Sequence, residues 1–209
     1  MKILALENST THGSIALFDP ATEPRIFQFE NDRKHSGSFF ESVKQLGDRI
    51  RTLNAIVVGL GPGSYAGVRI AIASAIGLKA ASGAKLVGLP SICAMEPSPN
   101  EYCVIGDARR ESFFFARVVA NRVTEGIDLC AETELRRRLE TISRDVPVFT
   151  SEKLPAFPQA TLAYPSAPRL GKLMEHGMVH SLEAPLQPIY LREPHITIPN
   201  DTGKLPLLG

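Results

Sequence analysis

The chain has 209 residues, of which 44% are hydrophobic and 22% charged, and its formal net charge is +1. This length and apolar content suit one compact domain or two small lobes, and the near-neutral charge argues against a main partner that is nucleic acid or anionic membrane. The sequence has three cysteines without C-x-x-C spacing, no signal-peptide pattern and no long apolar run. These features predict a reduced, cytoplasmic protein without a membrane segment.

The first hundred residues predict the element order β-β-β-α-β-α-β-α. Strands are expected at 2–7, 13–18 and 25–30, and short turns between them indicate an antiparallel meander. The pattern that follows predicts a helix over 38–50, a strand at 55–58, a helix over 66–81, a strand at 84–89 and a short helix opened by Pro90 and Ser91. This order is typical of the ribonuclease-H-like, actin-type fold.

A glycine-rich turn joins strand 55–58 to helix 66–81. Gly61, Pro62 and Gly63 break the chain, and Ser64 is placed to cap the helix. The turn is not a Walker A loop, because no Lys-Ser or Lys-Thr follows the glycines. It also departs from the dinucleotide fingerprint, since the spacing is G-x-G-x-x-x-G and no acidic residue occurs near 81–85. A structural turn that leads into a packed helix is therefore favoured over cofactor binding.

Helix 66–81 is apolar on nearly every side. Its only polar side chains are Arg69, Ser74 and Lys79, which do not gather on one face, and small residues recur along it. Small side chains let a second backbone approach closely, and a helix that is apolar nearly all round is normally buried nearly all round. We therefore expect it to pack on a sheet with one side and on another helix with the other.

Helix 38–50 also offers more apolar surface than one contact needs. Ser38 and Glu41 have the spacing of a capping box. The apolar stripe is flanked by Phe40 and Gly47, and it consists of Phe39, Val43, Leu46 and Ile50.

The second half predicts a smaller, related lobe. After the proline-rich stretch 97–100, a strand at 102–105, a charged turn at 107–111 and a strand at 112–119 resemble a second copy of the opening hairpin. Further on, a helix over 133–139 capped by Thr133, an edge strand at 146–149 and a short helix over 169–176 ending at Gly177 are expected. The expected division is therefore 1–98, 99–192 and an irregular tail at 193–209.

Few residues suggest chemistry. Glu7 ends the first strand before a Ser/Thr turn, where actin-type kinases carry an aspartate that holds metal-nucleotide. A plain strand-end residue is the favoured interpretation, and a vestigial nucleotide site at Glu7, Ser9 and Thr10 is the alternative. His176 and His180 have the spacing of a metal pair on a helix, but Gly177 lies between them and no third ligand is evident, so no metal is expected.

Asp107, Arg109 and Arg110 form the best polar constellation, at the mouth of the second hairpin. A salt-bridged turn is the favoured interpretation. No hydrolase signature, neither G-x-S-x-G nor H-E-x-x-H, is present.

These segments together resemble the TsaB (YeaZ) family. The resemblance rests on five stretches in matching order, at residues 4–10, 61–70, 87–91, 107–110 and 188–192, of which the glycine turn is the most specific. Glu7 and Asn8 stand where the family usually has Asp-Thr, and Ser36 and Gly37 where it usually has Ser-Glu. The resemblance implies an actin-like (ASKHA, ribonuclease-H-like) α/β fold with two related lobes, the second reduced.

The same resemblance implies a partner protein without catalytic residues or cofactors. Members of the family pair with TsaD, the transferase that adds threonylcarbamoyl to the tRNA adenosine next to the anticodon. TsaE, a small ATPase, joins the larger assembly, a homodimer is an alternative for the isolated chain, and contact with tRNA is expected to be indirect or weak. The implied partner-binding residues are Phe39, Phe40, Val43, Gly47, Val68, Arg69, Ile70, Ala73, Ser74 and Gly77.

Two other functions remain open on the sequence alone. One is an actin-fold, ATP-dependent phosphotransferase, which would need magnesium and nucleotide near Glu7. The other is a peptidase-like enzyme, after an older label for this superfamily.

Overall fold

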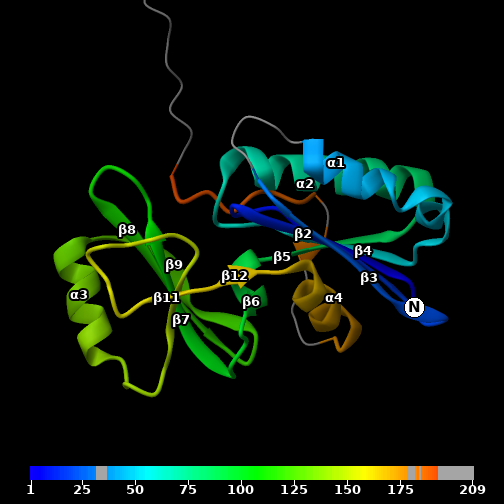
Figure 1. The fold of residues 1–209 in the computed structure, drawn as a ribbon. Helices are drawn as coiled ribbons and strands as arrows, with labels where there is room; N and C mark the ends of the chain where they lie inside the picture. The colour runs from blue at the N-terminus through cyan, green and yellow to red at the C-terminus, as the bar shows by residue number, and fades with distance from the viewer. Residues whose placement is uncertain (32–36, 178–181, 184, 193–209) are drawn as a thin grey trace, which may run out of the picture.

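The computed structural model describes residues 1–31, 37–177, 182–183 and 185–192, and it forms two sheets that lie side by side (Figure 1). The first sheet has the strand order β13-β5-β4-β1-β2-β3, in which β4 and β5 run parallel to β1 and the other three strands pair antiparallel with their neighbours. Its strands are β1 (Ile3–Glu7), β2 (His12–Asp19), β3 (Thr22–Glu30), β4 (Ala55–Gly59), β5 (Lys85–Leu89) and β13 (Leu182–Glu183).

Helices cover both faces of this first sheet. Helices α1 (Gly37–Lys44) and α2 (Tyr65–Ser82) lie on one face, and α4 (Ala167–Glu175) lies on the other (Figure 1). Alternate residues of a strand point to opposite faces. Accordingly, Leu4 and Leu6 of β1 join the core beneath α1 and α2, whereas Ile3 and Ala5 join the core that includes α4.

The second sheet repeats the opening of the first. Its order is β11-β10-β7-β8-β9, with β7 (Glu101–Asp107), β8 (Ser112–Val119) and β9 (Arg122–Ala131) forming the antiparallel meander and α3 (Glu132–Thr141) following it. Two short parallel strands, β10 (Val148–Thr150) and β11 (Thr161–Leu162), complete the sheet. The second copy of the hairpin is therefore confirmed. The predicted edge strand at 146–149 is instead an inner strand, because β11 pairs with its outer side.

Short elements connect the two sheets. The 3-10 turn η2 (Ser91–Ala94) follows β5 and corresponds to the short helix expected after Pro90. Strands β6 (Met95–Glu96) and β12 (Tyr164–Pro165) pair antiparallel. The chain leaves the first sheet near the expected boundary at residue 98. It returns with α4, where the backbone N–H of Ala167 donates to the Ser14 hydroxyl of β2 at 2.8 Å. The prediction of one lobe over 99–192 was therefore wrong for the part from α4 onward, and residues 193–209 lie outside the described residues.

Two helix predictions need correction. The expected helix over 38–50 is split, because Gly47 has a left-handed φ of +55° that an α-helix cannot include. The chain ends α1 at Lys44 and continues as the 3-10 helix η1 (Gly47–Thr52). Helix α3 begins earlier than expected, with Ala131 at its N-cap and no side-chain cap, so Thr133 lies inside the helix. Among the described residues, no helix is both long and apolar enough to cross a membrane.

Helix α2 is fixed to the sheet at its first turn. The Ser64 hydroxyl accepts from the Gly67 N–H at 3.2 Å, which confirms Ser64 as the N-cap. The Ser64 N–H donates to the carbonyl of Ser9 at 2.6 Å, and the Asn8 side-chain amide donates to the Gly67 carbonyl at 3.1 Å. A Cβ at position 67 would lie only 2.1 Å from the Asn8 carbonyl oxygen, so the approach requires glycine.

This contact generates a matched pair of substitutions within one helix. Gly67→Ala should lower the free energy of unfolding by about 1–3 kcal/mol, because the new methyl group meets backbone that cannot move independently. Gly77→Ala should raise that free energy by up to about 1 kcal/mol, because position 77 has open space and alanine favours a helix interior. Urea denaturation followed by circular dichroism measures both. Equal stability of the two variants would contradict the proposed docking of α2.

Candidate functional site

The outward face of α2 is built from small and apolar residues. Val68, Ala71, Ile72 and Ala75 are buried against the sheet, which confirms the predicted contact on one side. The opposite side carries Ala66, Ile70, Ala73, Gly77 and Ala80 at alternating spacings of four and three residues. Four of these five are exposed and Ile70 is half-buried.

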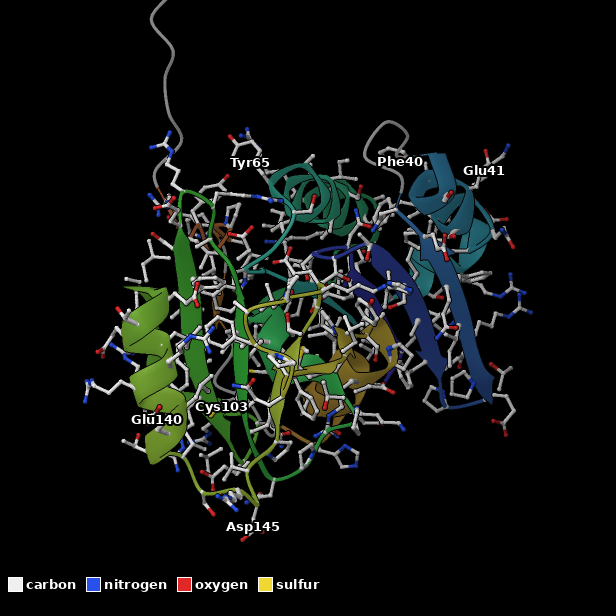
Figure 2. The ribbon with its side chains drawn as sticks, turned by 60° about the vertical axis from the view of Figure 1, so that its left-hand side comes forward. Phe40, Glu41, Tyr65, Cys103, Glu140 and Asp145 are labelled. Carbon is white, nitrogen blue, oxygen red and sulfur yellow. The ribbon has the colours of Figure 1, made fainter. Side chains whose placement is uncertain are left out.

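Large apolar side chains flank this row. Phe40 of α1 is 49% exposed and Ile76 of α2 is 51% exposed, on the same face of the first sheet. Figure 2 shows Phe40 and its neighbour Glu41 projecting from α1, while Tyr65 projects from the start of α2. We define the helical face as Phe40, Ala66, Ile70, Ala73, Ile76, Gly77 and Ala80.

The sequence-predicted partner residues divide into two groups. Phe39 and Val68 are corrections, because they are 0% and 3% exposed and fill the core beneath α1 and α2. The ring of Phe39 meets the ring of Phe40 edge-on at a centroid distance of 5.5 Å and so supports the exposed phenylalanine from below. The others keep surface, with Phe40, Gly47, Arg69, Ala73 and Gly77 exposed and Val43, Ile70 and Ser74 half-buried.

Ile76 was not singled out from the sequence. An apolar residue on an apolar helix looks like core until the inward positions are known. Ala75 is buried against the sheet, and the 100° rotation from Ala75 to the next residue turns Ile76 away from it, in agreement with the 51% exposure of Ile76.

The expected nucleotide position at the end of β1 is filled by the protein itself. Glu7 and Ser9 are 0% and 1% exposed, and one Glu7 carboxyl oxygen accepts from the Ser9 N–H at 2.7 Å. A Cβ at Gly59 would lie 1.9 Å from the other Glu7 oxygen and 2.5 Å from the Ser91 hydroxyl. These residues do not fit a metal-nucleotide, because β4 and the start of α2 occupy the space in front of Glu7 and Ser9. Thr10 is half-buried and caps the turn by accepting from the His12 N–H at 3.2 Å.

Burial dominates the acid–base behaviour of Glu7. Loss of solvent raises the pKa of this carboxyl, and the nearby polar groups of Ser9, Ser91 and Asn8, among them the Ser9 N–H that donates to it, only partly oppose that rise. Within the described residues, Glu7 Oε2, Asn8 Oδ1 and Ser9 Oγ are buried without a hydrogen-bond partner. The raised pKa reflects the cost of this polar cluster, since a neutral carboxyl is much cheaper to bury than a carboxylate.

The turn at 107–111 contains one of the segments that carried the resemblance, and it contacts Arg192 of another, the segment at 188–192. An Asp107 carboxyl oxygen accepts from the Arg109 N–H at 2.6 Å, and the other lies 3.2 Å from the Arg109 guanidinium, so the predicted salt-bridged turn is confirmed. Arg109, Arg110 and Glu111 all have left-handed φ values of 53° to 65°. The Arg192 guanidinium donates to the carbonyls of Ala108 and Arg109, both at 3.2 Å, and thereby braces this turn.

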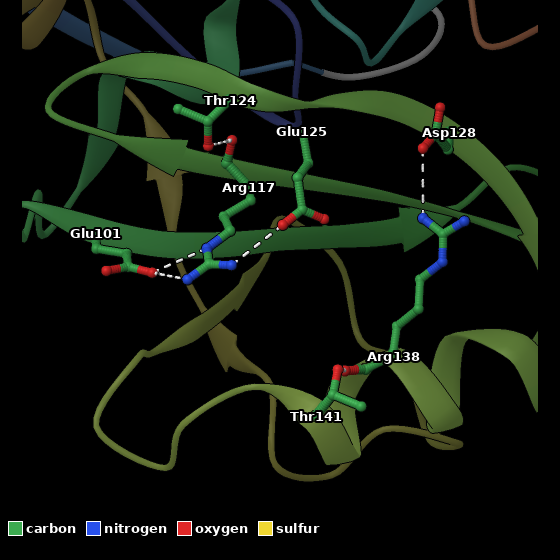
Figure 3. A network of polar contacts seen from close by, with 7 residues as sticks. All are labelled: Glu101, Arg117, Thr124, Glu125, Asp128, Arg138 and Thr141. Carbon is green, nitrogen blue, oxygen red and sulfur yellow. Dashed lines mark hydrogen bonds and ion pairs between the residues drawn. The ribbon is translucent and has the colours of Figure 1, made fainter.

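The basic run at 136–138 is neutralised by neighbouring carboxylates. Arg136 pairs with Glu132 at 2.6 Å, and Arg137 pairs with Glu134 at 2.9 Å. Arg138 pairs with both Glu134 and Asp128. Figure 3 shows the Arg138–Asp128 pair beside a second one, in which Arg117 lies between Glu101 and Glu125. This surface is therefore a solvated, self-paired face and does not gather positive charge.

The metal interpretation gains no support from the described residues. They contain no group of three His, Cys, Asp or Glu side chains that could hold a metal ion. The ring of His176 contacts the Lys172 carbonyl oxygen at 2.7 Å, and His180 lies outside the described residues.

The raised pKa of Glu7 predicts a pH-dependent stability. Because the folded state holds this proton more tightly than the unfolded state, its stabilising effect is full below the ordinary glutamate pKa of 4.5 and is lost as pH rises through the raised value. The urea midpoint should therefore fall as pH rises above the ordinary value of 4.5, and Glu7→Gln should flatten this dependence. Glu41→Gln, at an exposed position of α1, is the control and should leave the slope unchanged. A carboxylate at Glu7 that strengthens the fold at higher pH would contradict the assignment.

The sequence of this chain is similar to a known protein family and to individual relatives. The family model of TsaD, tRNA N6-adenosine threonylcarbamoyltransferase, matches residues 31–147, which is more than half of the chain. The tRNA threonylcarbamoyladenosine biosynthesis protein TsaB of Escherichia coli is 31% identical over 99 residues, covering 46% of this chain and 42% of that protein. An uncharacterized Mycobacterium tuberculosis protein is 31% identical over 143 residues, covering 68% of this chain and 65% of its own length.

Solved structures support the fold. The structure of YeaZ from Pseudomonas aeruginosa is 22% identical, with a TM-score of 0.68 over 91% of this chain and 99% of that one. Another Pseudomonas aeruginosa protein, described as similar to peptidase YeaZ, gives a TM-score of 0.70 at the same identity and coverage. The matches in the E. coli and mycobacterial proteins span about half to two thirds of those relatives' lengths. The chain has the actin-like α/β fold that YeaZ shares, and it belongs to the TsaD family.

Proposed function

We propose that the chain acts in threonylcarbamoyl modification of the tRNA adenosine next to the anticodon, as the non-catalytic partner of a TsaD-type transferase. The observation that carries this proposal is the helical face, an apolar surface on two neighbouring helices with no covering element among the described residues. Family membership and the name of the E. coli relative support the pathway.

The helical face has the shape that helix packing needs. Alanine and glycine at positions 66, 73, 77 and 80 form a shallow groove along α2 into which the ridge of a partner helix fits. Phe40 and Ile76 stand at its sides and supply large apolar side chains, the kind of anchor that dominates interface energy. A monomeric protein seldom leaves such a contiguous apolar patch in water. A specific complex here should bury on the order of 1,600 Å² in total.

A non-catalytic role is supported by the end of β1. A phosphotransferase of this fold class would need an ionised carboxylate that faces a metal-nucleotide. Glu7 is instead fully buried, with a raised pKa, against Gly59 and Ser91. A carboxyl that is closed off by the chain, and whose raised pKa disfavours the charged form, is poorly suited to bind a metal, because a ligating carboxylate must be ionised.

The transferase and a second copy of this chain would compete for the helical face. We expect the heterodimer with the TsaD-type protein to be the functional state, and a homodimer to form when the chain is alone. A TsaE-type ATPase would join through the heterodimer, and any tRNA contact through this surface would be indirect.

A charged residue at the centre of the helical face tests the proposal. Gly77→Arg should keep its circular dichroism spectrum, because the new side chain points into open space. It should weaken the complex with the TsaD-type transferase of the same organism by roughly a thousandfold, because a guanidinium would be buried unpaired in the interface. Co-purification and analytical ultracentrifugation measure the loss.

Gly126→Arg is the matched control, because Gly126 is an exposed glycine of β9 on the second sheet with ordinary backbone geometry. It adds the same charge away from the helical face and should leave the complex intact. Normal assembly of Gly77→Arg would place the interface elsewhere, and equal loss in both variants would point to a general charge effect.

The second test concerns catalysis. The isolated chain should hydrolyse neither ATP nor peptides, and it should not modify tRNA without the transferase, because the carboxyl at the end of β1 is closed off. Single-turnover assays at high protein concentration, with and without chelator, measure this. An activity that survives repurification and disappears in Glu7→Ala would favour the ATP-dependent phosphotransferase over the partner role.

A further inference from the structure

A groove of about 620 Å³ lies where four parts of the chain meet. These are the glycine turn with the start of α2, the turn at 107–111, Leu129 of β9, and the segment at 189–192, which belongs to the last stretch that carried the family resemblance. Backbone contacts fix the parts to one another, since the Ile189 N–H donates to the Leu60 carbonyl at 2.8 Å and Arg192 braces the second turn. The size is that of a small-molecule site.

The groove gathers positive charge. Arg109, Arg110 and Arg192 line it, and no Asp or Glu is among the described residues that do so. The guanidinium of Arg110 has no ion-pair partner in the described part of the chain, in contrast to the self-paired arginines of α3. Arg109 shares Asp107 but remains 67% exposed at its side chain. Within the described residues, Arg110 therefore offers an unpaired guanidinium to an anion from solvent, and the exposed Arg109 guanidinium can add a contact while it stays paired with Asp107.

A stacked pair of tyrosine rings forms another wall of the same groove. The rings of Tyr65 and Tyr190 stack with a centroid distance of 5.3 Å and an interplanar angle of 27°. Both remain accessible, at 49% and 40% exposure. The guanidinium carbon of Arg69 lies 4.9 Å from the centroid of the Tyr65 ring, and the same guanidinium donates to the Tyr65 hydroxyl. Tyr190 and Arg69 therefore both hold the Tyr65 ring in place.

We propose that this groove binds a nucleotide, with its phosphate on Arg109 and Arg110 and its base against the Tyr65–Tyr190 pair. Guanidinium groups match phosphate oxygens in a bidentate manner, and aromatic side chains stack on bases of any identity. An inorganic anion would use the arginines alone and leave most of the groove empty. The nucleotide can be a free nucleoside monophosphate or one unit of a single-stranded RNA, since both present the same phosphate and base.

The inference does not rest on the proposed partner role. Tyr65 and Gly77 are twelve residues apart on α2, which is about 18 Å along the helix axis. Variants of the groove can therefore lose nucleotide binding without losing the transferase, and variants of the helical face can do the reverse. Gly77→Arg should bind nucleotide normally.

Isothermal titration with 5′-AMP, adenosine and inorganic phosphate tests the chemistry. We expect saturable binding of 5′-AMP, and binding at least about tenfold weaker for adenosine and for phosphate, because each lacks one of the two contacts. A labelled short single-stranded RNA, followed by fluorescence anisotropy, identifies the source. Tighter binding of RNA than of 5′-AMP, with a marked loss at higher salt, assigns the groove to an RNA strand. Equal or weaker binding of RNA assigns it to the free nucleotide.

Variants tie the binding to the groove. Arg110→Ala and Tyr190→Ala should each weaken 5′-AMP binding by about tenfold or more, whereas Tyr190→Phe keeps the ring and should bind nearly as well as the natural chain. Arg144→Ala is the matched control, because Arg144 is an exposed arginine beside Asp145, which Figure 2 shows at the end of the molecule opposite Tyr65. It should leave binding unchanged.

Three results would overturn the proposal. They are no saturable binding of either 5′-AMP or RNA, phosphate binding as tight as that of 5′-AMP, and equal effects of Arg110→Ala and Arg144→Ala. Circular dichroism of each variant excludes unfolding as the cause of a loss.

Discussion

The rest of the structure depends on the close contact between the β1–β2 turn and the first turn of α2. The Ser64 N–H donates to the Ser9 carbonyl at 2.6 Å, the Asn8 amide donates to the Gly67 carbonyl, and Gly67 has no side chain to hold the two backbones apart. Polar backbone groups that would otherwise be buried without partners are thereby satisfied. The contact fixes both the position and the rotation of the longest helix of the first sheet.

This one contact has two functional consequences. It closes the space in front of Ser9, next to Glu7, whose burial against Gly59 and Ser91 raises the pKa of its carboxyl. It also turns Val68, Ala71 and Ala75 toward the sheet, which leaves the small residues of α2 facing outward. Closure of the space in front of Ser9 and exposure of an apolar helical face therefore have the same physical origin.

The second sheet and the last described segment add a separate surface. Carboxylates neutralise the arginines of α3, whereas Arg110 has none among the described residues and lies across the groove from a stacked tyrosine pair. Arg192 connects the two regions through its bonds to the carbonyls of the 107–111 turn. The pairs of α3 with Glu132 and Glu134 join residues three or four apart on one helix, whereas the groove around Arg110 is assembled from distant parts of the chain.

The sequence by itself determined the opening meander, the N-cap at Ser64, the limits of α2 to within one residue, and the repetition of the hairpin, because period, capping and turn chemistry are local. It missed β9, whose alternating polar residues form a strand only because β8 supplies the ladder, and it ran α1 through Gly47. Which apolar residues face solvent was decided only by tertiary packing. Phe39 and Phe40 are adjacent and chemically identical, yet one fills the core and the other lies at the surface, because only the docked sheet defines an inward direction.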